Sequence, residues 1–322
     1  MQSGKALADL YCRGQYLSLA IAGLLALGGC IAAPTSPRPE QRAPVVQPKP
    51  IEPSAENKAL ASYYASVQQN LLTQGLLRID GGGPDTPFSK RDIVNNFIKI
   101  GVFSEFDFVD GTFQGRGGES VVRRYSEPVR LMLDFAPAIT EANRSEITST
   151  TQQYLGRLAS VTNHPIRLDQ KDPNFLVAIL DIDSMKTYVP KLQAFAPGLE
   201  ASFAKRMLAL DRPDHCVVYT FNDPATPAKI YKSVALIRAE HPKLLREKCL
   251  HEEIAQGMGL VNDSPRARPS IFNDDDEFAY LTSHDELLLK ILYDPRLPLG
   301  ATPQQARPVV EVIASELLGG ES

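Results

Sequence analysis

The stretch that decides the fold is Cys249–Asp263, which reads CLHEEIAQGMGLVND. Within it, Glu252 and Gln256 are four residues apart and would share one face of a helix. Gly259 can adopt the left-handed conformation that ends a helix and reverses the chain. We therefore predict a helix that carries Glu252 and Gln256, followed by a turn that brings Asn262 back toward both side chains.

The same stretch resembles the signature of the metzincin metallopeptidases, although not in the frame that His251 suggests. An H-E-x-x-H motif beginning at His251 would need a second histidine where the chain has Ala255. Shifted by one residue, E-E-x-x-Q-x-x-G-x-x-N has the spacing of the metzincin motif H-E-x-x-H-x-x-G-x-x-H. The resemblance implies that Glu252, Gln256 and Asn262 stand at the positions of the three zinc-binding histidines. His251 itself is expected on the surface of the helix.

Glu253 stands, by the same resemblance, where the general base of the peptidase belongs. A zinc hydrolase needs three strong ligands, normally imidazole nitrogens, and an open position for water. The amide oxygens of Gln256 and Asn262 are weak ligands for zinc, and oxygen-only sites suit harder ions such as calcium, manganese or magnesium. Asp263 is one further carboxylate that could complete a metal site. We therefore expect no resident cofactor, with a divalent metal ion as the alternative.

Downstream segments extend the resemblance. Ser270–Phe272 is similar to the S-I-M of a metzincin Met-turn, with Phe272 in place of Met as the structural residue of the turn. Leu281–Asp285 leads into a helix like the one that closes matrixin domains. With the E-E-x-x-Q helix, Ser270–Asp275 (SIFNDD) and Leu292–Leu297 (LYDPRL) are also similar to an uncharacterised family of proteobacterial lipoproteins, known only as a domain of unknown function.

The fold class follows from the order of apolar patterns in the chain. Apolar residues that alternate or form short continuous runs predict strands, and apolar residues at helical spacing predict helices. We predict strands at 129–135, 164–168, 175–182, 216–221 and 230–237, and helices at 141–158, 184–193, 199–210, 243–260, 285–292 and 309–318, with Pro308 in the first turn of the last helix. This order predicts an α+β fold. It matches the zincin or metzincin-like fold that the resemblance implies, with a mixed twisted sheet, a backing helix and an active-site helix after the last strand.

Composition divides the chain into four segments. Residues 1–29 are predicted to be a lipoprotein signal peptide, because a short apolar run ends in small residues before Cys30. Residues 30–54 are rich in proline and predict an extended tether. Residues 55–120 are predicted to form a helical annex, and residues 121–322 the metzincin-like domain.

Cys30 is the predicted lipidation site and would be the first residue of the mature chain. At about 0.8 kcal/mol per buried methylene, several acyl chains on one cysteine hold a protein on a membrane. The alternatives are an ordinary signal peptide cleaved nearby, or an uncut apolar helix that serves as the anchor. Ile31 follows the cysteine, as in lipoproteins that are sorted to the outer membrane. We therefore expect the protein in the bacterial cell envelope, at the periplasmic face of the outer membrane.

Charge and cysteine content restrict the partners and the compartment. The chain has 34 Lys and Arg against 38 Asp and Glu, and an acidic chain without a basic stripe is a poor candidate for binding nucleic acid. Cys216 and Cys249 lie outside the signal and anchor region, and in an oxidising periplasm they predict a disulfide. The alternative is two free buried thiols.

Three functions agree with these patterns. The first is non-catalytic binding of a peptide or protein segment in the cleft that peptidases of this fold use for extended substrates. The second is metal-dependent peptide hydrolysis with Glu253 as the general base. The third is a structural role in the envelope. The expected partners are the membrane, through the lipid anchor, and a peptide or another envelope protein.

Overall fold

A mixed sheet forms the centre of the fold. The computed structural model describes residues 52–319 apart from 105–106, 110–111 and 115–116. In this part of the chain the sheet has the order β5-β4-β6-β8-β7, in which β7 alone runs antiparallel to its neighbour. The short β3 (Arg124–Tyr125) pairs in parallel with the first half of β8. The bounds of the other strands are β4 Val129–Phe135, β5 Ile166–Leu168, β6 Phe175–Leu180, β7 Cys216–Asp223 and β8 Thr226–Arg238.

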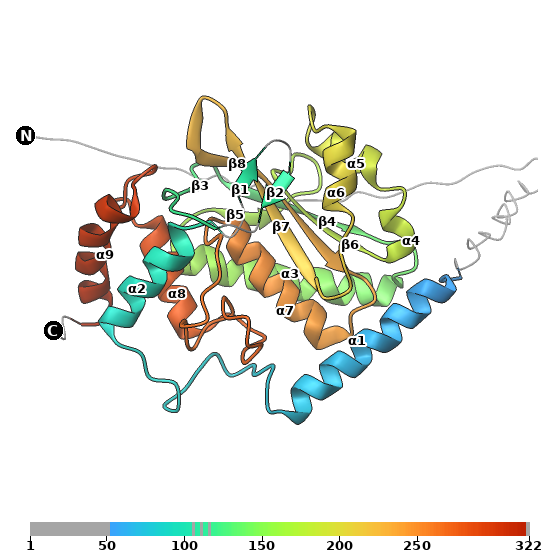
Figure 1. The fold of residues 1–322 in the computed structure, drawn as a ribbon, viewed down its shortest axis with the longest axis horizontal. Coiled ribbons are helices and arrows are strands. Elements are labelled where there is room, and N and C mark those ends of the chain that lie inside the picture. Colours follow the sequence, from blue (N-terminus) through green and yellow to red (C-terminus); the bar gives the residue numbers. More distant parts are fainter. Residues whose placement is uncertain (1–51, 105–106, 110–111, 115–116, 320–322) are drawn as a thin grey trace, which may run out of the picture. The chain divides into compact units, whose positions relative to one another are not determined.

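Helices cover both faces of this sheet (Figure 1). One face packs against α3 (Glu141–Thr162) and α7 (Lys243–Gly257), which contribute to the main apolar cluster. The other face packs against α4, α5 and α6, whose residues form a second cluster. Every residue of β6 is buried, and its sequence is continuously apolar because it has protein on both sides. The three small helices are α4 Ile182–Met185, α5 Val189–Phe195 and α6 Ala201–Met207.

Three helices pack together beside the sheet and complete the main cluster. These are α2 (Lys90–Gly101), α8 (Ser283–Tyr293) and α9 (Pro303–Leu317). The sequence predicted that α9 begins near Val309, but it begins at Pro303. Thr302 caps it, a proline at the first helical position needs no hydrogen-bond partner, and Pro308 lies within the helix.

The predicted annex at 55–120 consists of parts that pack in different places. The first helix, α1 (Ala55–Thr73), buries Leu60 and Tyr64 in a small cluster with Leu77, Leu245 and Ala279. The second helix, α2, belongs to the main cluster. Between α2 and β3, a hairpin is formed by β1 (Asp107–Val109) and β2 (Thr112–Gln114).

The predicted membrane anchor falls outside this description. The signal peptide at 1–29, Cys30 and the tether up to residue 51 lie outside the described residues. Among the residues that are described, no helix is both long and apolar enough to cross a membrane.

Candidate functional site

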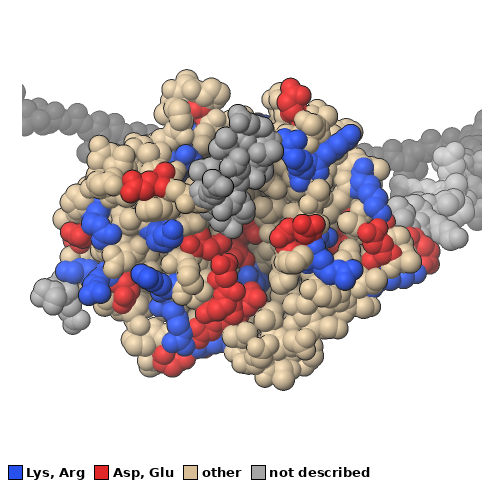
Figure 2. Space-filling model, in the orientation of Figure 1, with Lys and Arg blue, Asp and Glu red and all other residues tan. Residues whose placement is uncertain are grey.

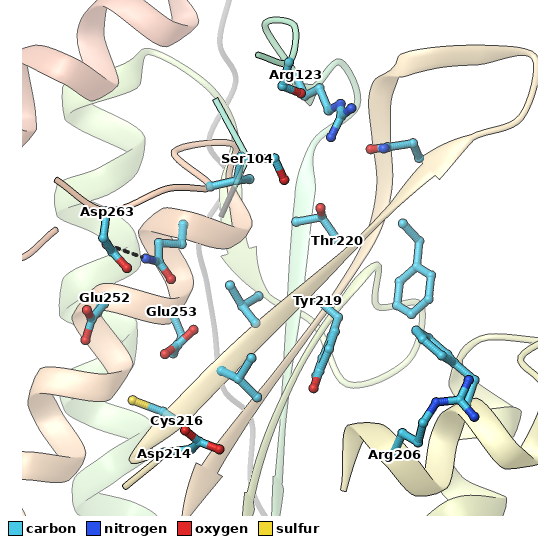
Figure 3. Close-up of a pocket in the computed structure, with 18 of the residues that line it drawn as sticks. Ser104, Arg123, Arg206, Asp214, Cys216, Tyr219, Thr220, Glu252, Glu253 and Asp263 are labelled. Carbon is cyan, nitrogen blue, oxygen red and sulfur yellow. Dashed lines mark hydrogen bonds between the residues drawn. The ribbon is translucent and has the colours of Figure 1, made fainter. Parts of the chain in front are cut away.

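A pocket of about 1760 Å³ lies along β7. Residues 216–222 all line it, with residues of α7 on one side and of the segment 196–210, which contains α6, on the other. Figure 3 shows Glu252 and Glu253 of α7 to one side of β7 and Arg206 of α6 to the other. The strand therefore forms the floor of a site between two helical walls.

The helix predicted from the sequence motif brings its polar residues to this pocket. Glu252, Glu253 and Gln256 line it from α7, and Asp263 lines it from the segment that follows the turn. The side-chain amide of Gln256 donates a hydrogen bond to the Asp263 carboxylate, at 3.0 Å (Figure 3). Four of the five polar positions predicted for the site therefore share one pocket.

Asn262 is the exception, and the prediction that it returns toward Glu252 and Gln256 needs correction. Its side-chain amide donates to the carbonyl of Lys99 at 2.8 Å, and its backbone N–H donates to the carbonyl of Ile100 at 3.2 Å. Both carbonyls belong to the last turn of α2, where a helix leaves its C=O groups without internal partners. Asn262 therefore satisfies the end of α2, and Asp263 takes the position beside Gln256.

Gly259 makes the turn between α7 and these residues, as predicted. Its φ is +127°, a backbone conformation that residues other than glycine rarely adopt. A Cβ atom at this position would lie 2.2 Å from the carbonyl oxygen of Arg123. The turn therefore needs glycine both for its backbone conformation and for the close approach of the segment that precedes β3.

Lys248 is a site residue that sequence reasoning missed. Its ammonium lies 2.8 Å from the Glu252 carboxylate and 3.1 Å from Asp276, and the side chain is 9% exposed. Burial opposes its charge, but Glu252 and Asp276 together raise the pKa of the ammonium above its usual range. Burial raises the pKa of the Glu252 carboxyl, and Lys248 counteracts that rise. The Lys248-to-Glu252 spacing of four residues was the available signal.

Acidic groups outnumber this lysine on the α7 side of the pocket. Figure 2 shows acidic side chains gathered in the middle of the face, over α7 and the loop that follows it. Besides Glu252 and Asp276, the pocket lining on this side includes Glu253, Asp263 and Asp274. The α7 wall is therefore net negative even with Lys248 counted.

The donor groups do not fit the zinc site that the resemblance implies. Glu252 is already paired with an ammonium, and Asn262 binds the end of α2. Gln256 donates to Asp263 through its Nε2 and would offer a metal only a neutral amide oxygen. Ligand atoms of Cys216, Glu252 and Glu253 lie within 4.8 Å of one another, but the sulfur of Cys216 is bonded to another cysteine and cannot act as a thiolate. These side chains are arranged as a set of internal ion pairs and hydrogen bonds.

The disulfide between Cys216 and Cys249 is present, with Cα atoms 5.9 Å apart. Cys216 is the first residue of β7, and Cys249 lies in the middle of α7. The bond therefore joins the floor of the pocket to its acidic wall.

The opposite wall is aromatic. Phe203 of α6 packs edge-on against Tyr219 of β7, with ring centroids 6.5 Å apart, and Phe221 of β7 belongs to the same apolar cluster. All three side chains are partly exposed and line the pocket. The sequence motif did not predict these residues, because they belong to elements that precede it in the chain. The tertiary fold alone brings them beside α7.

The predicted turn at Ser270–Phe272 is fastened to α8 by one buried carboxylate. Asp285 accepts hydrogen bonds from the Ser270 hydroxyl at 2.6 Å and the Ile271 N–H at 3.0 Å, and also caps α8 with Thr282. Phe272 is fully buried in the main cluster. The turn and the closing helix, both identified from the resemblance, are thus one hydrogen-bonded unit.

The prediction that His251 lies on the surface of the helix is wrong. Its ring stacks between Tyr154 and Tyr280, with centroids 3.9 and 4.6 Å away, and its Nδ1 accepts a hydrogen bond from the Leu281 N–H. Burial, assisted by the charge of Arg157, lowers the pKa of His251 to about 3. The residue therefore fixes α7 against α3 and the loop before α8 as a neutral ring.

Taken together, the fold and the site define a mixed α/β protein with a pocket along the antiparallel edge strand of its sheet. A family model described as "Protein of unknown function (DUF2927)" matches residues 90–312, and the chain belongs to this uncharacterised family. The match confirms the expectation of an uncharacterised family. No curated protein and no solved structure matches the chain.

Proposed function

We propose that the protein is a lipid-anchored component of the bacterial cell envelope that binds an extended peptide or protein segment along β7 without cleaving it. The observation that carries this proposal is the position of β7. It lies at the edge of the sheet and lines the pocket, and among the described strands only β8 pairs with it. An edge strand presents backbone N–H and C=O groups that an added strand can pair with.

The arrangement of elements supports a metzincin-like fold for residues 121–322. The resemblance implies a mixed sheet, a backing helix and an active-site helix after the last strand. The chain has a mixed sheet, α3 against one face, and α7 directly after β8. In this proposal residues 30–54 are the tether and Cys30 carries the lipid.

The internal pairing of the motif residues supports a non-catalytic role. Glu252, Gln256 and Asp263 are each engaged with another side chain, and the ammonium of Lys248 lies beside Glu252, the residue at the position of the first ligand. The alternative, a metal-dependent peptidase with Glu253 as base, predicts stoichiometric metal in protein purified without a metal-binding tag. A purely structural role predicts that neither metal nor peptide binds.

Display selection of random peptides against the immobilised full chain, in a nonionic detergent, tests the proposed function. We expect selected peptides whose affinity falls when alternate backbone nitrogens are methylated, because methylation removes the N–H groups that pair with β7. Thr220→Trp fills the pocket beside the strand and should abolish binding. Thr226→Trp is the matched control, since Thr226 is exposed and does not line the pocket. Binding that survives both methylation and Thr220→Trp would contradict the proposal.

A further inference from the structure

The two faces of β7 meet different surroundings. Cys216 and Val218 pack against the main cluster, on the side of α7. Val217, Tyr219 and Phe221 pack against the second cluster, on the side of α6. This alternation is the two-residue period of a strand, and it means that odd and even positions of β7 face the two walls of the pocket.

A segment that pairs with β7 would show the same alternation. Its side chains would point in turn toward α7 and toward α6, because strands added to a sheet share its pleat. One wall would therefore receive every second side chain, and the other wall would receive the rest.

The two walls differ in chemistry. Among the described residues on the α7 side, the pocket is lined by five carboxylates, those of Glu252, Glu253, Asp263, Asp274 and Asp276, and by the ammonium of Lys248. Arg123, from the segment before β3, adds one more cation to the lining, so carboxylates still outnumber cations. On the α6 side it is lined by Phe203, Tyr219 and Phe221, with the Arg206 guanidinium 5.5 Å from the Phe203 ring centre and with Glu200 as one carboxylate beside that one guanidinium. The first wall suits cationic side chains and the second suits apolar or aromatic ones.

We propose that the pocket selects an extended segment in which lysine or arginine alternates with apolar residues, the basic side chains facing α7 and the apolar ones facing α6. The inference rests on the proposed function, since it requires strand pairing with β7. It adds the class of partner: a basic, alternating stretch of another protein or peptide.

Fluorescence anisotropy with labelled nonapeptides and the full chain in nonionic detergent tests this inference. The first peptide alternates lysine and leucine, the second replaces each lysine by glutamate, and the third has the composition of the first with its lysines in one block. We expect the first peptide to bind about tenfold more tightly than either of the others at low salt. A tenfold difference in affinity is about the size expected when a few partly exposed charge pairs form with one peptide and not with the other. The difference from the glutamate peptide should shrink as salt is added.

Substitutions on the α7 wall connect this preference to particular residues. Glu253→Gln combined with Asp263→Asn should reduce the preference for lysine over glutamate severalfold. Glu141→Gln is the matched control, because Glu141 is an exposed carboxylate of α3 outside the pocket. Equal loss in the control would show that overall charge, and not the wall, attracts the peptide, and would overturn the inference.

The outcomes separate this inference from the proposed function. Peptides that bind in a methylation-sensitive way without preferring lysine at alternate positions would overturn the inference and leave strand pairing intact. Equal affinity for the alternating and the block peptide would also overturn it. If methylated and unmethylated peptides bind alike, the proposed function itself fails.

Discussion

Gly259 determines where the side chains after α7 point, because it reverses the chain at a place that has no room for a Cβ atom. Gly259→Ala should destabilise the fold by more than about 2 kcal/mol, since both the positive φ and the contact with the Arg123 carbonyl become unfavourable. Urea unfolding followed by circular dichroism measures this change. Gly156→Ala is the matched control, because this glycine lies inside α3 with nothing within 4 Å. It should stabilise by about 0.5 to 1 kcal/mol, and a Gly259→Ala variant as stable as the control would refute the account of the turn.

His251 should make stability depend on pH. Its pKa is about 3 in the folded protein, against 6.5 for an ordinary histidine, so the unfolded chain binds a proton that the folded chain excludes. Stability should therefore fall as pH decreases from about 6.5 toward 3, by up to about 1.4 kcal/mol per pH unit from this residue.

The measurement compares the pH dependence of the unfolding free energy in the original chain and in His251→Phe, which keeps an aromatic ring between Tyr154 and Tyr280. The slope between pH 6 and pH 4 should be smaller in the variant by about the slope of one proton. His164, His215 and His241 also have lowered pKa values and contribute a background that both proteins share. Identical slopes would mean that His251 is accessible to protons in the fold.

At the residue scale, the sequence motif located the site but not all of its contacts. The spacing of Glu252, Gln256 and Gly259 indicated a helix face and a turn, and both are local consequences of chain geometry. Whether Asn262 or Asp263 faces the pocket depends on the carbonyls at the end of α2, which lie more than 160 residues earlier. Such a contact cannot be predicted from spacing within the motif.

Among the elements, β7 and α7 depend on one another through the Cys216–Cys249 disulfide. The bond closes a loop with a sequence separation of 33, and on the chain-entropy model such a loop stabilises the fold by about 3 to 4 kcal/mol. The Cys216→Ala, Cys249→Ala double variant should lose about this much unfolding free energy in urea. Reductant should destabilise the original chain and leave the variant unchanged, and a loss below about 1 kcal/mol would contradict the role assigned to the bond.

Strands were predicted more closely than the short helices. The strand at 129–135 was predicted at its observed bounds, because its alternating, largely apolar pattern matches the two-residue period of a strand. The predicted helix at 184–193 is instead divided between α4 and α5, and the one at 199–210 is confirmed as α6 but is shorter at both ends. Their ends are set by packing on β6 and β8, which overrides the weak preferences of single residues.

On the scale of the whole molecule, the sequence pattern predicted helices but not the distant elements against which they pack. Helices α1 and α2 are neighbours in the chain, yet α1 packs beside Leu245 and α2 beside α8 and α9. A helical pattern shows which face is apolar, but not which distant element will cover it. The aromatic wall of the pocket was missed for the same reason.

The proposed lipid anchor is tested by expression in a Gram-negative bacterium, with labelled palmitate and membrane fractionation. The original chain should take up label and sediment with the outer membrane. Cys30→Ser should do neither, whereas Cys12→Ser, within the predicted signal peptide, should behave like the original. Label-free protein that still sediments with membranes in Cys30→Ser would indicate an uncut helix as the anchor and contradict lipidation.

The positive charge that balances Glu252 and Asp276 in the pocket belongs to a side chain, Lys248, and not to a bound ion that can dissociate. A chelating agent can inactivate a metalloenzyme by removing its zinc or calcium ion, but it cannot remove a lysine side chain, which is covalently part of the chain. The charge balance of this pocket should therefore be the same in metal-rich and metal-poor media, and chelating agents should leave the proposed binding of peptides unchanged.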